Sequence, residues 1–131
     1  MLKKIKRFQR LAILRKRDIS KEIISSNLLE NEIVKNKNLI NQIDSIMESG
    51  KVKADKHFIS AGYFKNNTQL LSTLQNQKNI ANQRQQYLVA EKKIIQSKIV
   101  ANNIKKIKAE EKSSEYKKSH REELDNKSYG L

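Results

Sequence analysis

Apolar residues recur along the first 50 residues with the spacing of a helix that packs against one partner. Alternate steps of three and four residues from Ile5 to Met47 meet thirteen positions, nine of them apolar. These positions are Ile5, Phe8, Ala12, Arg15, Ile19, Glu22, Ser26, Leu29, Ile33, Asn36, Ile40, Ile43 and Met47. A repeat of about 3.5 residues is typical of a coiled-coil seam. Four apolar residues one position to the side widen the predicted stripe: Leu11, Ile23, Leu39 and Ile46.

Two seven-residue repeats run side by side in the second half of the chain. The first consists of Leu74, Ala81, Leu88 and Ile95, and the second of Ile80, Tyr87, Ile94 and Ala101. Leu71 and Ile99 supply intervening positions, and the pattern predicts a second long helix. Polar residues interrupt the seams of both halves, and such residues usually set register and pairing at some cost in stability. The interruptions are Arg15, Asn36, Lys78 and Asn102.

The helical pattern breaks around Gly50. The segment from Glu48 to Asp55 is typical of a helix stop, with Gly50 in a left-handed conformation and Asp55 as a candidate N-cap for the next helix. We therefore expect an all-α fold in which two long helices form an antiparallel coiled-coil hairpin. The expected bounds are about 2–48 for helix one, 49–56 for the connection and 57–127 for helix two, within a single domain of residues 1–131.

The second predicted helix is longer than the first, so part of it overhangs. A reversal near residue 53 places Ile5 opposite the region near residue 101. Residues 108–131 are then unpaired, and only five of these 24 residues are apolar. A helix this polar stands in water alone or frays until a partner holds it.

Composition excludes several classes of protein. The 131 residues include no proline, no cysteine and three glycines, which fits long helices and argues against turn-rich sandwiches, barrels and doubly wound sheets. The lack of cysteine removes disulfides, thiolate zinc sites and a cysteine nucleophile. No apolar run approaches the length of a membrane span, and we expect a cytoplasmic protein.

The formal charge of +14 is concentrated in two blocks. Residues 1–21 carry a net +8 and residues 92–121 a net +7, whereas residues 22–91 contribute only +1 and residues 122–131 contribute −2. The predicted hairpin brings the two basic blocks together at one end. Such an end is either a solvated helix face or a binding surface for an acidic protein, nucleic acid or an anionic membrane.

The sequence offers no catalytic constellation. His57 and His120 are far apart in a hairpin, and Gly50-Lys51 lacks both the upstream glycine and the following serine or threonine of a phosphate-binding loop. The adjacent acidic pairs at 110–111 and 122–123 point about 100° apart on a helix, so neither pair shares a proton. We therefore expect a binding protein that is not an enzyme and uses no cofactor or metal.

A cluster of aromatic and aliphatic residues marks the start of the second helix. Its members are Phe58, Ile59, Tyr63, Phe64, Leu70, Leu71 and Leu74. Two interpretations are open: the cluster plugs the tip of the hairpin, or it forms an exposed patch that docks a partner.

With these features the sequence resembles the FliJ family, small coiled-coil proteins of the flagellar type III export apparatus. The resemblance lies in the segment from Phe8 to Leu11 within a basic first turn, the aromatic start of helix two, and the charged segment from Lys105 to Lys112. The stretch from Arg121 to Asp125 is similar to the family's C-terminal pattern, which ends in a Leu-Asp or Met-Asp pair.

The resemblance implies a stalk-like role at the cytoplasmic face of the inner membrane. FliJ-like proteins insert into the hexameric ring of the export ATPase, stimulate it, and couple it to the export gate, substrates and export chaperones. By this resemblance the ATPase ring would contact Arg7, Arg10, Arg15, Lys98 and Lys105. The cytoplasmic domain of the gate would contact Phe58, Tyr63, Phe64, Leu71 and Leu74. The alternative function is nonspecific binding of nucleic acid by a basic coiled coil.

Overall fold

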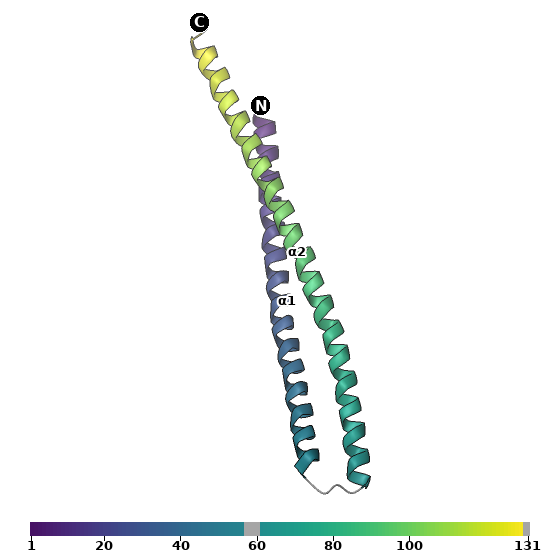
Figure 1. Cartoon of the computed structure of the whole chain (residues 1–131). Coiled ribbons are helices and arrows are strands. Elements are labelled where there is room, and N and C mark those ends of the chain that lie inside the picture. The colour runs from purple at the N-terminus through teal and green to yellow at the C-terminus, as the bar shows by residue number, and fades with distance from the viewer. Residues whose placement is uncertain (57–60, 130–131) are drawn as a thin grey trace. The chain divides into compact units, whose positions relative to one another are not determined.

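Two long helices make up the fold (Figure 1). The computed structural model describes the backbone of residues 1–56 and 61–129, and the side chains of these residues except 51–56, 61–64 and 129. Helix α1 spans Leu2–Lys56 and helix α2 spans Ala61–Tyr129, with 55 and 69 residues. The described residues contain no strand. The predicted all-α fold, in which two helices pack against each other and the second is the longer, is confirmed.

The chain divides into two compact units, each built from a segment of both helices. Unit 1 contains Met1–Ser26 and Lys93–Leu131, and unit 2 contains Asn27–Lys92. Pairing is antiparallel within each unit. In unit 1, residues 8 and 15 contact residues 116 and 102. In unit 2, residues 32 and 44 contact residues 84 and 78.

The seam of α1 follows the predicted repeat. All thirteen positions from Ile5 to Met47 are buried or half-buried, with Ile5 and Ile43 only 6% and 4% exposed. The four flanking apolar residues, by contrast, are 36–52% exposed. Their predicted place in a wider stripe is wrong, because one partner helix covers little beyond the seam itself.

The seam of α2 differs more from the prediction. In the first repeat Leu74, Ala81 and Leu88 are buried, which confirms those positions. The second repeat points outward, since Ile80 and Tyr87 are 66% and 64% exposed. Ile94 and Ala101, its other members, are exposed as well. The half-buried positions that alternate with the first repeat are Leu71, Lys78, Gln85, Lys92 and Ile99. Lysine fits such a position because its aliphatic stem packs while its ammonium group reaches the edge.

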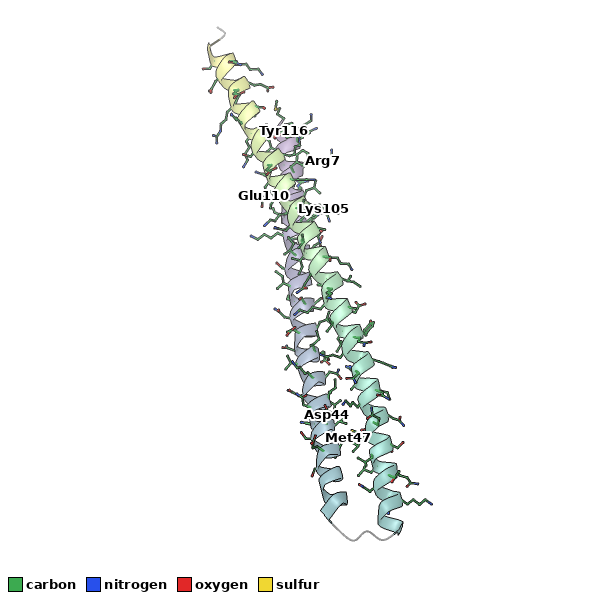
Figure 2. The ribbon with its side chains drawn as sticks, in the orientation of Figure 1. Arg7, Asp44, Met47, Lys105, Glu110 and Tyr116 are labelled. Atoms are coloured by element: carbon green, nitrogen blue, oxygen red, sulfur yellow. The ribbon has the colours of Figure 1, made fainter. Side chains whose placement is uncertain are left out.

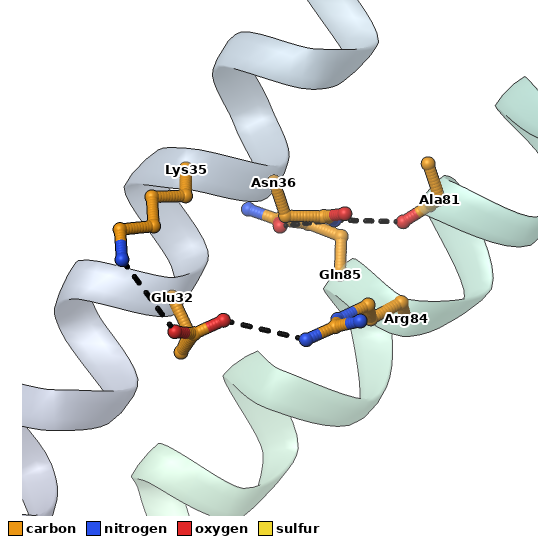
Figure 3. Close-up of polar contacts among 6 residues, drawn as sticks. All are labelled: Glu32, Lys35, Asn36, Ala81, Arg84 and Gln85. Carbon is orange, nitrogen blue, oxygen red and sulfur yellow. Dashed lines mark hydrogen bonds and ion pairs between the residues drawn. The ribbon is translucent and has the colours of Figure 1, made fainter.

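Polar contacts hold the two seams of unit 2 in register (Figure 3). Asn36 is 6% exposed, and its Nδ2 donates to the Ala81 carbonyl oxygen at 2.8 Å and to Gln85 Oε1 at 2.8 Å. Lys78 Nζ lies 2.6 Å from Asp44 Oδ1, and Lys92 pairs with Glu30. Because a buried amide loses these bonds if either helix slides, the contacts select one alignment.

Gly50 does not end the first helix. It lies inside α1 without a positive φ, and Asp55 also lies within α1 instead of capping α2. A Cβ atom on Gly50 would lie 3.8 Å from Leu71 Cδ2 and 3.8 Å from Asn67 Oδ1, so α2 packs directly against this position. The predicted stop is wrong because packing and continuous backbone hydrogen bonds outweigh a glycine penalty of about 1 kcal/mol. The predicted connection at 49–56 is helical, and residues 57–60 lie outside the described part.

The pairing in unit 1 differs from the predicted alignment. Phe8 meets Tyr116, whereas the predicted alignment set Ile5 opposite the region near residue 101. Ala109 and Ser113, predicted to be unpaired, are 7% and 5% exposed. Residues 121–128 are all exposed, so within unit 1 the overhang begins about one helical turn after Tyr116.

Replacement of Gly50 by alanine should stabilise the protein. The site is helical and an added Cβ meets its neighbours at ordinary contact distance, so Gly50→Ala is expected to raise the free energy of unfolding by about 0.5–1 kcal/mol. Urea denaturation followed by circular dichroism at 222 nm measures this. The control Ser49→Ala, at an exposed helical neighbour, should give a smaller gain. A loss of stability in Gly50→Ala would contradict the helical conformation of this residue.

Candidate protein-binding surface of unit 1

Unit 1 holds most of the charge of the chain. Its two segments carry a net +11 of the total +14, and unit 2 carries +3. The contacts of Phe8 with Tyr116 and of Arg15 with Asn102 place the two basic blocks side by side. Close packing of like charges opposes folding unless a partner or counterions neutralise them, so this surface is suited to an anionic partner.

Four of the five residues predicted to contact an ATPase ring are exposed. These are Arg7, Arg10, Lys98 and Lys105, and Figure 2 shows Arg7 and Lys105 in unit 1. Arg15 is half-buried instead. Of the five, Arg15 and Lys105 line the same groove. The predicted set therefore combines solvent-facing charges with one residue of the seam.

The groove shared by Arg15 and Lys105 has an apolar floor and a cationic rim. We call it the cationic groove. Its volume is about 230 Å³, and its lining residues are Phe8, Leu11, Arg15, Lys105, Lys108, Ala109 and Lys112. Four of these seven are basic and none is acidic. Arg15 and Lys112 also pair with acidic residues on their own helices, at 4.0 Å to Asp18 and 3.5 Å to Glu115.

A second groove runs along the other side of the seam. This polar groove measures about 460 Å³ and is lined by Gln9, Ala12, Ile13, Glu110, Ser113, Ser114 and Lys117. Its lining contains one acidic residue, Glu110, and one basic residue, Lys117, so their formal charges cancel. The two grooves are built from the same pair of helix segments, so their different charge follows from which heptad positions carry lysine.

A polar layer crosses the seam beside the cationic groove. Arg15 Nη1 donates to Asn102 Oδ1 at 3.1 Å, and Asn102 Nδ2 donates to Glu22 Oε1 at 2.7 Å. Glu22 Oε2 is buried and accepts no hydrogen bond from the described residues. Two of the predicted polar interruptions, Arg15 and Asn102, thus bind each other and hold unit 1 in register.

An aromatic pair packs across the seam near the start of α1. The rings of Phe8 and Tyr116 stack with centroids 5.6 Å apart and an interplanar angle of 13°, and Lys4 Nζ lies 5.4 Å from the Tyr116 centroid. Such contacts add to the stability from buried area. Sequence reasoning placed Tyr116 in the unpaired overhang. Steps of seven residues from Leu74 do lead to Ala109 and Tyr116, and this extension of the repeat could have identified the pair.

The cluster at the start of α2, which includes the five residues predicted to bind an export gate, is only partly described. Phe58 and Ile59 lie outside the described residues, and Tyr63 and Phe64 belong to α2 without described side chains. Leu74 is 8% exposed and Leu71 is half-buried next to Gly50. For these two leucines the burial favours packing within the coiled coil.

The described residues offer neither a membrane-spanning segment nor a metal site. In the described parts of α1 and α2, no segment is apolar enough to cross a membrane. Residues 1–56 and 61–129 contain no described group of three or more metal-ligating side chains placed to hold an ion. No family model, curated protein or solved structure matches the chain.

Proposed function

We propose that this chain is a non-enzymatic binding protein that docks an acidic protein surface through unit 1. The observation that carries the proposal is the pairing of residues 1–26 with residues 93–120, which concentrates positive charge around an apolar groove. Charge complementarity speeds association and rejects wrong partners, and an apolar centre supplies affinity. Unit 2, with a net +3 and ion pairs across its seam, fits a structural role.

Within this class we propose a FliJ-like stalk of the flagellar export apparatus. An antiparallel two-helix protein with a longer second helix and a cationic paired segment fits insertion into an ATPase ring. The ring would contact Arg7, Arg10, Lys98 and Lys105, with Arg15 in a supporting position. The start of α2 would face the export gate, and the protein would act in the cytoplasm, peripheral to the inner membrane.

Stimulation of the export ATPase tests this role. The purified ATPase is expected to hydrolyse ATP faster when the chain is added. Arg7→Glu combined with Arg10→Glu should raise the concentration of the chain needed for half-maximal stimulation at least about tenfold. Each reversal replaces an attraction to the acidic partner by a repulsion. Arg15 is left unchanged because it holds Asn102.

A matched pair of reversals in unit 2 serves as the control. Lys37→Glu combined with Lys65→Glu changes the net charge equally at exposed positions and should leave stimulation unchanged. Equal losses in both double variants would show that net charge alone matters. No stimulation by the unmodified chain would contradict the stalk role.

Nonspecific nucleic-acid binding is the second candidate, favoured by the net +11 of unit 1 and a sequence pI of about 10.0. Phosphate contacts make such binding fall steeply between about 50 and 200 mM salt. The aromatic rings near the basic blocks are already engaged, since Phe8 stacks on Tyr116, so few rings remain for base stacking. Gel shifts at rising salt distinguish the two functions: micromolar DNA affinity at physiological salt, without ATPase stimulation, would favour the second.

A further inference from the structure

The cationic groove has the shape and chemistry of a docking site for one more helix. We propose that it binds an acidic amphipathic helix of a partner protein. An apolar side chain of that helix rests on Phe8, Leu11 and Ala109, and its carboxylates meet the basic rim. The inference rests on the proposed function only in treating unit 1 as a protein-binding surface.

The floor of the groove provides apolar contact next to the seam. Leu11 is 36% exposed, Phe8 is half-buried and Ala109 is 7% exposed. Leu11 flanks the seam at a position that a two-helix coil leaves open and that a third helix covers. The volume of about 230 Å³ is below the roughly 300–1,000 Å³ of small-molecule pockets, so the groove fits side chains of a helix better than a free ligand.

The rim of the groove sets the charge of the partner. Arg15, Lys105, Lys108 and Lys112 surround the floor without an acidic neighbour in the lining. Lys105 and Lys108 form no ion pair with any residue that the structure describes. Lys105 and Lys108 each lie one position before a seam residue of α2, Lys106 and Ala109, so they lie beside the seam where carboxylates of a third helix can reach them. An acidic helix is therefore complementary to both the floor and the rim.

Other partners fit this groove less well. A second copy of the chain would bring another unit with a net +11 against the rim, which costs free energy. A lipid surface contacts convex apolar faces, and this site is concave. Nucleic acid would meet the lysines but gains little from the aliphatic floor, whereas the apolar ridge of an amphipathic helix fills it.

The cysteine-free sequence makes a site-specific binding assay possible. Ala101→Cys, at an exposed position one helical turn before Lys105, labels the edge of the cationic groove with an environment-sensitive fluorophore and keeps its basic rim intact, and Ser114→Cys labels the polar groove as the control. The probe is a synthetic helical peptide with leucine along one face and glutamate beside it, together with the same peptide carrying lysine for glutamate. With the full-length chain, the acidic peptide should shift the fluorescence at position 101 saturably and at position 114 little, and the basic peptide should shift neither.

Variants of the two grooves decide the outcome. Leu11→Glu and Lys105→Glu should each weaken the acidic peptide about tenfold, and Ile13→Glu and Lys117→Glu in the polar groove should change its affinity less than about twofold. Circular dichroism checks that each variant keeps its helices. Equal weakening by the two pairs, or no saturable binding, overturns the inference. This assay contains no ATPase, so it tests the groove separately from the proposed stalk role. ATPase stimulation without peptide binding overturns the proposal for the groove alone. Peptide binding without ATPase stimulation supports the proposal for the groove and contradicts the stalk role.

Discussion

Truncation of Leu88 to alanine is expected to lower the free energy of unfolding by about 2–4 kcal/mol, because it leaves a cavity in the seam of unit 2. Leu88 is only 6% exposed. The matched variant Ile80→Ala, from the outward-facing repeat of the same helix, should change stability by less than about 0.5 kcal/mol, because Ile80 is 66% exposed.

Urea denaturation measures the two values, and amide hydrogen exchange assigns the loss to unit 2. Leu88→Ala should accelerate exchange in residues 27–92, and Ile80→Ala should leave those rates near those of the unmodified chain. Similar losses in both variants would mean that both repeats are packed, and would contradict the seam described for α2.

Replacement of Asn102 by leucine is the second large change expected. It removes the amide that bridges Arg15 and Glu22, so a half-buried guanidinium and a half-buried carboxylate lose their shared partner. We expect a loss of about 1–3 kcal/mol, since a buried polar group without a hydrogen bond costs this much. Asn103→Leu, at the exposed neighbouring position, should cost less than about 0.5 kcal/mol.

A triple variant separates stability from register. Substitution of Arg15, Glu22 and Asn102 together by leucine should restore most of the lost stability, because an apolar layer needs no hydrogen bonds. Register should be less defined, because polar seam residues select alignment. Nuclear Overhauser effects between the rings of Phe8 and Tyr116 report the alignment. A triple variant with the full ring signal would show that the polar layer is not needed for register.

The first seam could be predicted from the sequence because one periodicity runs through α1 unbroken. The seam of α2 could not, because Ile80 and Tyr87 have the same seven-residue spacing as Leu74 and Ala81. The residues of α1 that face α2 decide which positions of α2 are packed. Lys78, for example, is half-buried because Asp44 of α1 lies 2.6 Å away. Such pairing depends on which residues face each other and does not show in the spacing along one helix.

Gly50 shows the same dependence on the partner helix. Local propensity predicts a stop there, yet α2 packs against this position and α1 stays helical to Lys56. The basic blocks could be predicted because net charge needs no alignment. The cationic groove could not, since its floor joins Leu11 to Ala109 only in the observed register.

The lysines in the seam of α2 also affect which helix α2 pairs with. Lys78 and Lys92 each face a carboxylate of α1, Asp44 and Glu30. If two α2 helices from different molecules paired along the same seam, Lys78 and Lys92 would lose the carboxylates of Asp44 and Glu30, which α1 supplies. These ion pairs contribute little to the stability of the fold, yet they favour pairing of α2 with α1 over pairing with a second α2 helix.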